Sequence, residues 1–157
     1  MKKTPITIIL PDIRSAMNIG AIFRTADAIG AEKIYLTGYS ATPAHPKVAK
    51  TAIGAENTVP WEYRDDLETL IAELKTAGYT ICALEKTATS KSLWEVKPIF
   101  PVALIVGNEI LGVPEEIQRL CDEVVHLPML GAKESLNVAT ASGIALYYFL
   151  EKWTLTK

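Results

Sequence analysis

The sequence lacks the surplus of positive charge that is typical of proteins whose whole surface binds nucleic acid. Its 157 residues include 16 lysines and arginines against 18 aspartates and glutamates, which gives a net charge of −2 at pH 7. The overall field of such a molecule does not attract a polyanion. Any site that binds nucleic acid must therefore be built locally.

Cysteine is scarce, and the sequence holds only Cys82 and Cys121. These two thiols lack metal-ligand spacing, and no set of histidines, cysteines and carboxylates has it either, so we expect no metal cofactor. Cys82 stands in an apolar run and is expected to be a buried, free thiol. His126 stands within a predicted strand and is expected to be structural.

Long apolar runs are also missing. The longest charge-free apolar stretch, residues 138–150, is too short to span a bilayer. The run after Lys2 and Lys3 is interrupted by Pro11 and Asp12, unlike a secretory signal. With 49% hydrophobic and 22% charged residues, the composition is that of an ordinary globular domain. We expect a cytoplasmic protein that does not bind membranes.

Short apolar runs alternate with helical patterns along the chain. The runs are β-branched and mostly continuous, which is typical of strands covered on both faces. We predict one α/β domain over residues 1–157, with no separate RNA-binding domain, a mainly parallel sheet and helices on both faces. The predicted strands are 6–10, 33–38, 58–63, 79–85, 102–107 and 123–128; the predicted helices are 18–30, 65–78 (capped by Asp65 and Gly78), 114–121 and one beginning near Ser135.

Residues 38–57 form the most irregular predicted loop. In open α/β sheets, ligands bind outside the carboxyl ends of the strands. Three other stretches are expected at this edge, and each is more unusual than a plain turn.

The first stretch is PDIRSAMNIGAIFRTAD, residues 11–27. Asn18 is a good candidate for a helix N-cap. Gly20 and Arg24 lie on the polar side of the predicted helix, one turn apart, so the glycine would clear space around the guanidinium. Alternatively, this side is a solvated face on which Arg24 pairs with Asp27.

The second stretch is LIVGNEILGVPEE, residues 104–116. Gly107 follows a buried strand and would permit the backbone to approach a ligand closely. Glu109 places a charge beside that strand, although it could equally face solvent in a crossover loop. The stretch matches neither glycine-rich phosphate-binding pattern, GxxxxGK[ST] or GxGxxG.

The third stretch is PMLGAKESLNVATASGIALYYFL, residues 128–150. An adenine could lie against the apolar residues around Pro128. Ser135 and Asn137 supply a hydroxyl and an amide where a helix begins. Capping by Ser135 would account for one polar residue, but not for Asn137 together with the polar residues that follow it.

Taken together, the three stretches resemble, in order and spacing, the three motifs of the SpoU (TrmH-type) branch of the SPOUT RNA methyltransferases. The resemblance extends from about Ile6 to Leu150. It implies an α/β fold with a trefoil knot near the carboxyl end, S-adenosyl-L-methionine as the cofactor, and transfer of a methyl group to a ribose 2′-hydroxyl of RNA.

The resemblance also implies roles for individual residues. Arg24 would stabilise the developing alkoxide and bind the adjacent phosphate, and Glu109 would orient Arg24 through an ion pair. The implied catalytic residues are Asn18, Arg24, Glu109, Ser135 and Asn137. The implied cofactor-binding residues are Leu84, Gly107, Asn108, Glu109, Leu127, Pro128, Met129, Ser135, Leu136 and Asn137.

The RNA substrate is expected to be a transfer RNA, with ribosomal RNA as the alternative. Local cations must hold it, and the candidates are Arg14, Arg24, Lys47, Lys50 and Lys133. Two further functions stay open: methylation of a base nitrogen, which the combination of Arg24 with Asn137 disfavours, and RNA binding without catalysis.

The last predicted helix is apolar on every side from residue 138 to residue 150. A helix that is apolar all round must be buried all round. We therefore predict a two-fold homodimer in which this helix meets the partner, with large side chains such as Tyr148 as anchors. The family is dimeric, and Arg24 would reach the cofactor of the other subunit.

Overall fold

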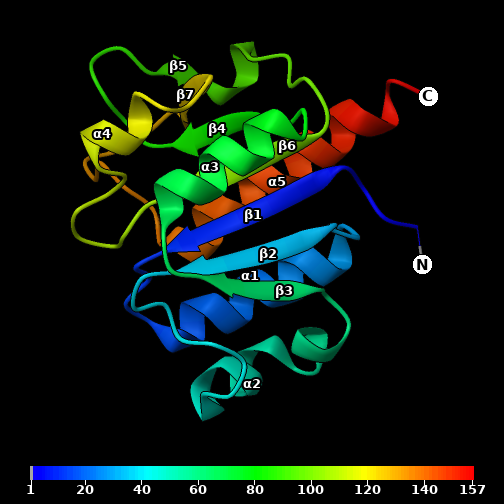
Figure 1. The fold of residues 1–157 in the computed structure, drawn as a ribbon. Helices are drawn as coiled ribbons and strands as arrows, with labels where there is room; N and C mark the ends of the chain where they lie inside the picture. The colour runs from blue at the N-terminus through cyan, green and yellow to red at the C-terminus, as the bar shows by residue number, and fades with distance from the viewer. Residues whose placement is uncertain (1) are drawn as a thin grey trace.

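The computed structural model describes residues 2–157, which fold around one seven-stranded sheet (Figure 1). The strand order is β3-β2-β1-β6-β4-β7-β5, and every neighbouring pair is parallel. The predicted parallel sheet is therefore confirmed. The strands are β1 (Ile6–Pro11), β2 (Lys33–Thr37), β3 (Trp61–Arg64), β4 (Thr80–Leu84), β5 (Lys91–Ser92), β6 (Val102–Val106) and β7 (Glu123–His126).

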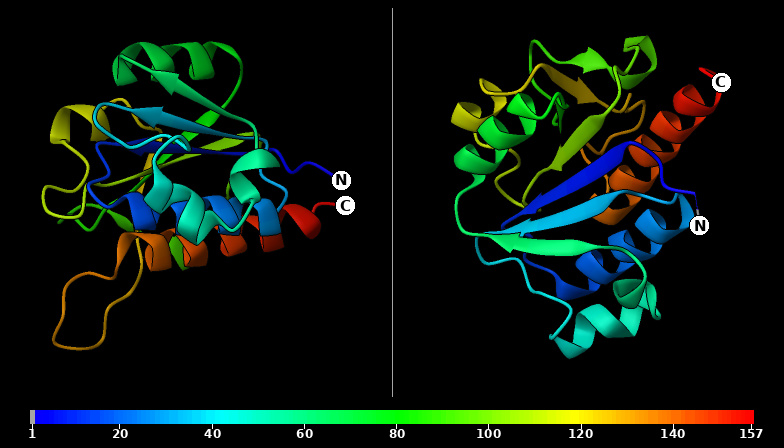
Figure 2. Two further views of the ribbon diagram at one scale, coloured as in Figure 1. Left: turned by 90° about the horizontal axis from the view of Figure 1, so that it is seen from below. Right: turned by 45° about the vertical axis from the view of Figure 1, so that its right-hand side comes forward.

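Helices cover both faces of the sheet, as predicted. On one face α1 (Ala16–Ala28) and α5 (Val138–Thr154) lie side by side, and α2 (Pro46–Ala52) packs against α1 (Figure 2). The other face carries α3 (Leu67–Thr76) and α4 (Glu115–Gln118). Two short 3₁₀ turns, η1 (Ala55–Asn57) and η2 (Leu93–Glu95), complete the elements. Within residues 2–157, no helix combines the length and apolar character that crossing a membrane requires.

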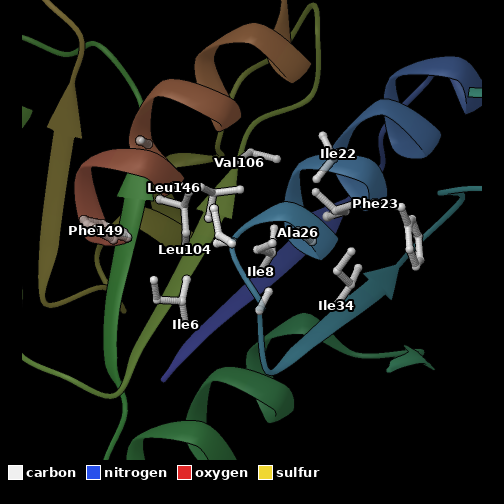
Figure 3. Close-up of a cluster of buried hydrophobic side chains, with 14 of the residues drawn as sticks. Ile6, Ile8, Ile22, Phe23, Ala26, Ile34, Leu104, Val106, Leu146 and Phe149 are labelled. Atoms are coloured by element: carbon white, nitrogen blue, oxygen red, sulfur yellow. The ribbon is translucent and has the colours of Figure 1, made fainter. Parts of the chain in front are cut away.

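The sheet has a hydrophobic core on each face. Figure 3 illustrates the core under α1 and α5, where Ile8 of β1 packs with Phe23 and Leu146. The next strand residue, Ile9, belongs to the opposite core, beneath α3. Successive residues of a strand point to opposite faces, so a strand buried on both sides is continuously apolar. Cys82 is free and buried as expected, and burial raises the pKa of its thiol to about 12.

The N-caps of two helices differ from the predicted residues. α1 is capped by Ser15, whose hydroxyl accepts a hydrogen bond from the Asn18 N–H at 3.2 Å, so Asn18 lies inside the helix. α3 is capped by Asp66, which accepts from the Glu68 N–H, and not by Asp65. In each case two adjacent or nearby polar residues could cap the helix, and the backbone geometry selects one.

Four short elements, α2, η1, β5 and η2, were not predicted. The expected loop at residues 38–57 contains α2, which His45 caps by accepting a hydrogen bond from the Lys47 N–H at 3.1 Å. This helix has seven residues, too few for a clear hydrophobic period. Strand β5 has only two residues and pairs with β7. Such a short edge strand leaves no sequence pattern.

Gly20 has a different role from the predicted one. It is buried against α2 and makes no room for Arg24. A Cβ at this position would collide with the Thr51 hydroxyl and the Val48 carbonyl, and would lie 2.9 Å from the Ala52 nitrogen. The missing side chain therefore allows α1 and α2 to pack closely.

We expect Gly20→Val to destabilise the fold by about 1–3 kcal/mol, because the added carbons must displace the α2 backbone. Urea denaturation would measure the change in the free energy of unfolding. Gly131→Ala is the control, since a Cβ at Gly131 meets no atom within 4 Å. Equal midpoints for Gly20→Val and the wild type would contradict the close packing of α1 on α2.

Candidate functional site

A cavity of about 480 Å³ opens at the carboxyl ends of β4, β6 and β7. This volume falls within the usual range of small-molecule sites, roughly 300–1,000 Å³. The segments that follow the three strands form its wall together with the start of α5. The lining residues are Leu84, Glu85, Lys86, Val106, Gly107, Asn108, Glu109, Ile110, Gly112, His126, Leu127, Met129, Glu134, Ser135, Leu136, Asn137, Val138 and Ala141.

All the cofactor-binding residues expected from the sequence line this cavity except Pro128. Pro128 is exposed beside them, between two residues that do line the wall. The expected residues lie far apart in the chain. They meet here because the parallel sheet brings the carboxyl ends of β4, β6 and β7 to one edge.

The loop after β6 is held in a tight turn by its own backbone and by one amide. The Asn108 Oδ1 accepts hydrogen bonds from the N–H groups of Ile110 and Leu111, each at 2.8 Å. A Cβ on Gly107 would lie 2.8 Å from the Gly112 carbonyl carbon. We expected Gly107 to let a ligand approach the backbone; in the structure its missing side chain lets the two ends of the loop approach each other.

Half of the lining residues were not predicted as site residues, among them Glu85, His126 and Glu134. Glu85 is the last residue of a predicted strand, whereas Glu109 follows one, and the Glu85 Oε2 accepts a hydrogen bond from the Val113 N–H at 2.7 Å. Position at a strand end is the sequence signal that could have found it. His126 lines the cavity too, with its Nδ1 2.9 Å from the Ser90 hydroxyl, so the imidazole is also held by a structural contact.

Three of the expected catalytic residues form one hydrogen-bonded chain. Glu109 accepts hydrogen bonds from the backbone N–H groups of Arg14 at 2.9 Å and Ser15 at 3.1 Å, and from the Asn18 amide at 3.2 Å. The Asn137 amide donates to the Asn18 Oδ1 at 3.1 Å. The loop after β6, the start of α1 and the start of α5 are thus tied together at the wall of the cavity.

Glu109 is stabilised as a carboxylate. Partial burial opposes its ionisation, but the hydrogen bonds from Arg14, Ser15 and Asn18 outweigh that effect and hold its pKa below the usual value. The amino end of α1 adds to this stabilisation, because unpaired N–H groups and the helix dipole favour a negative charge there.

Within one chain, the predicted ion pair between Glu109 and Arg24 does not form. The carboxylate is occupied by donors at the start of α1, whereas Arg24 is exposed further along the helix and does not line the cavity. Among the residues that the structure describes, no ion pair involves Arg24. Unpaired backbone donors at a helix start compete for a nearby carboxylate, and here they bind it.

Asn137, and not Ser135, begins the last helix. The Asn137 Oδ1 accepts hydrogen bonds from the N–H groups of Ala139 at 2.9 Å and Thr140 at 3.1 Å, so α5 starts at Val138. Ser135 instead lies exposed on the preceding loop and lines the cavity. Asn137 therefore has two functions, since one side-chain atom caps α5 and the other binds Asn18.

The cations expected to bind RNA are exposed on separate segments around this edge. Arg14 directly precedes α1, and Lys47 and Lys50 lie on α2. Lys133 belongs to the loop of residues 127–137, which projects from the molecule as the orange segment in the left view of Figure 2.

Comparisons with known proteins agree on one family. A model of the SpoU rRNA Methylase family matches residues 5–147. A Burkholderia protein named 23S rRNA (guanosine-2′-O-)-methyltransferase RlmB is 34% identical over 143 residues, which cover 91% of this chain and 58% of that protein. The tRNA (guanosine(18)-2′-O)-methyltransferase of Aquifex aeolicus is 33% identical over 147 residues, 93% of this chain and 69% of that one. The chain thus spans little more than half the length of the rRNA-modifying relative.

A solved structure supports the same relationship. The AdoMet-bound rRNA methyltransferase from Sinorhizobium meliloti superimposes with a TM-score of 0.86 at 30% sequence identity. The match covers 94% of this chain and 56% of that one.

Glu109→Gln tests the role of the carboxylate. The variant should lower the free energy of unfolding at pH 7 by about 1 kcal/mol, because its amide faces N–H groups that need an acceptor. The folded-state pKa of Glu109 is lowered, so ionised Glu109 stabilises the wild type above the unfolded pKa and this stabilisation is lost as pH falls through the folded value. Between about pH 5 and 3 the difference between the two proteins should shrink.

Urea denaturation at a series of pH values would measure this, with Glu116→Gln on the exposed surface of α4 as the matched control. If the free energies of unfolding of the wild type and Glu109→Gln changed in parallel with pH, the proposed stabilisation by ionised Glu109 would be contradicted.

Proposed function

The chain belongs to the SpoU rRNA Methylase family, and on this basis we propose that it transfers a methyl group from S-adenosyl-L-methionine to a ribose 2′-hydroxyl of RNA. One observation carries the proposal: Asn18, Glu109 and Asn137 meet in one hydrogen-bonded chain, of which Glu109 and Asn137 line the cavity. The names of the Burkholderia and Aquifex relatives support it, since both describe guanosine 2′-O-methylation.

The cavity fits the proposed cofactor in size and chemistry. Apolar side chains such as Leu84 and Leu127 suit an adenine, and the carboxylates of Glu85 and Glu134 suit the positive charges of an ammonium and a sulfonium. The AdoMet-bound structure of the Sinorhizobium relative supports the assignment. When bound, S-adenosyl-L-methionine supplies a methyl group that is already activated on a sulfonium, so the main task of the protein is positioning.

The residues of the chain would divide this task. Arg24 stays charged at any ordinary pH and has no acceptor, so it would bind the developing alkoxide and the adjacent phosphate rather than remove the proton. Glu109 and Asn18 would hold the start of α1 against the loop after β6, which places the helix that carries Arg24. Asn137 and Ser135 would contact the cofactor and the ribose.

A second copy of the chain is the proposed partner. We expected α5 to be buried on every side. Within one chain it is not, because Ile144 is 38% exposed and Tyr147 is 52% exposed. Tyr148, the anchor that the sequence suggested, instead donates a hydrogen bond to the Val96 carbonyl at 2.8 Å and packs on Trp94. We propose that a partner subunit covers the face of α5 that contains Ile144 and Tyr147.

Such a dimer accounts for the position of Arg24. This side chain does not line the cavity of its own chain, although the proposed chemistry needs it there. In a two-fold dimer each Arg24 would enter the cavity of the partner subunit. Each active site would then combine Arg24 from one chain with Asn137 from the other.

The proposed RNA is a transfer RNA. In support, the Aquifex relative that is named for tRNA is 33% identical over 93% of this chain. The exposed cations Arg14, Arg24, Lys47, Lys50 and Lys133 would bind its phosphates. An RNA substrate fits the cytoplasmic location expected from the sequence. The trefoil knot stays a prediction, supported by family membership.

Two measurements test the function. Mass-spectrometric mapping of ribose methylation in cells with and without the gene should reveal one tRNA nucleotide that loses its methyl group. Purified protein with methyl-labelled S-adenosyl-L-methionine should label tRNA from the deletion strain. Labelling of the rRNA fraction instead would show that the substrate is rRNA, and labelling on a base would show that the acceptor is not a ribose hydroxyl. No labelling of any RNA would refute the proposed methyltransferase activity.

We expect Arg24→Ala to lower kcat about 10²–10³-fold, the usual effect of removing one donor to a developing oxyanion. Its affinity for S-adenosyl-L-methionine should stay close to that of the wild type, because Arg24 does not line the cavity of its own chain. Calorimetry and the methyl-transfer assay measure the two effects. Arg119→Ala, on the exposed surface near α4, is the control.

Mixing two inactive variants tests whether the site is shared. Asn137→Asp keeps an N-cap for α5 but removes the amide donor to Asn18. When Arg24→Ala and Asn137→Asp chains are coexpressed, about a quarter of wild-type activity should return, because half of the dimers are mixed and each mixed dimer keeps one intact site. No recovery would place Arg24 and Asn137 in a site made by one chain.

Tyr147→Glu should separate the subunits, because it places a charge in the proposed apolar interface. Light scattering should report a monomer, and methyl transfer should fall at least tenfold while the cofactor cavity is unchanged, an effect on the order of 1.4 kcal/mol. Trp61→Leu, an exposed aromatic on β3 at the edge of the sheet, should stay dimeric. A monomeric wild type at micromolar concentration would overturn the dimer and the shared site together.

A further inference from the structure

The aromatic ring of Tyr39 is exposed at the edge of the site but is held in a fixed position. Its exposed fraction is 62%, whereas Asn108, which lies in the wall of the cavity, is only 9% exposed. The Asn108 amide donates hydrogen bonds to the Tyr39 hydroxyl and to the Asp12 carbonyl, each at 2.7 Å. The ring is thus attached to the same amide that shapes the loop after β6.

The backbone around this tyrosine is held in an uncommon conformation. Asp12 has a φ of 50°, which is rare for a residue other than glycine, and Gly38 has a φ of 60°. The Asp12 carboxylate accepts a hydrogen bond from the Tyr39 N–H at 2.9 Å, and the Tyr63 hydroxyl donates to the Gly38 carbonyl at 2.8 Å. Strain of this kind persists where the surroundings over-determine the backbone, and it gathers at functional sites.

This arrangement is unlike that of an ordinary surface tyrosine, which has a mobile ring and a solvated hydroxyl. Here the hydroxyl is bound to a nearly buried amide, and the flanking backbone is fixed at both Asp12 and Gly38. Proteins that bind single-stranded RNA stack unpaired bases on aromatic rings presented in this way. Asp12 also leads directly to Arg14 and Ser15, whose N–H groups bind Glu109.

We propose that Tyr39 stacks on a base of the RNA substrate and thereby places the target ribose at the cavity. The inference rests on the proposed function and adds a substrate-positioning residue to it. The target nucleotide would be unpaired when it binds, since a base inside a duplex exposes no face to the ring.

Steady-state methyl transfer to tRNA from the deletion strain tests the role of the ring. Tyr39→Leu should raise the KM for RNA about tenfold, in line with the loss of one base–aromatic stack. Its affinity for S-adenosyl-L-methionine should change less than about threefold, since Tyr39 does not line the cavity. Tyr39→Phe keeps the ring and should recover most of the lost RNA affinity, whereas a role confined to the hydrogen bond from Asn108 would leave both variants equally impaired.

Trp94→Leu is the matched control, because it removes an exposed aromatic near β5, at the opposite edge of the sheet from β3. This variant should leave the KM for RNA and the affinity for S-adenosyl-L-methionine unchanged. An unchanged KM in Tyr39→Leu, or a loss equal to that of Tyr39→Phe, would overturn the stacking.

Photocrosslinking separates this inference from the proposed function. Ultraviolet irradiation of the wild-type protein with the same tRNA, followed by mass spectrometry of the peptides, should find a nucleotide attached to Tyr39. An adduct at Tyr39 without methyl transfer would sustain the RNA contact and refute the enzyme. Methyl transfer with adducts only at other residues would sustain the enzyme and refute the contact.

Discussion

The Glu109 carboxylate is the contact on which the candidate site depends. It binds two backbone N–H groups and the Asn18 amide at the start of α1, and through Asn18 it is linked to Asn137 at the start of α5. Apolar packing could bring these segments near one another, but packing has no direction. Hydrogen bonds from a helix start to a carboxylate have both direction and length. The same few bonds therefore define the position of the first helix, the last helix and the loop between them.

The tight loop after β6 adds a second constraint from the opposite side. Asn108 closes the loop internally and Glu85 holds its far end, so the wall of the cavity is supported by side chains from two strands. Asn108 also binds Asp12 and Tyr39, which belong to the segments after β1 and β2. The buried amide thus connects the side where the cofactor is proposed to bind to the side where RNA is proposed to bind. A single side chain with four hydrogen-bonding contacts links both halves.

Much of the fold could be predicted from the sequence because its strands are buried on both faces. Continuous runs such as residues 102–107 have few alternatives, and their alternation with helical patterns indicates a parallel sheet. The wall of the cavity was also predictable, since the carboxyl ends of parallel strands share one edge. The contacts that each polar side chain makes were not predictable. Glu109 was expected to bind a cation, but it binds backbone N–H groups. Gly20 was expected to make room for Arg24, but it makes room for α2. Sequence gives the type of a side chain, but its neighbours depend on packing between distant segments.

The strand order has a consequence for how the protein is made. β1 pairs with β2 on one side, but on the other side it pairs with β6, where Ile6 lies opposite Val102. The ribosome adds about 5–20 residues per second, so this second edge of β1 waits roughly 5–20 s for its neighbour. During that time an apolar strand edge with unpaired N–H and C=O groups is open to other nascent chains. The yield of folded protein should therefore depend on translation speed and on chaperones that cover the waiting edge.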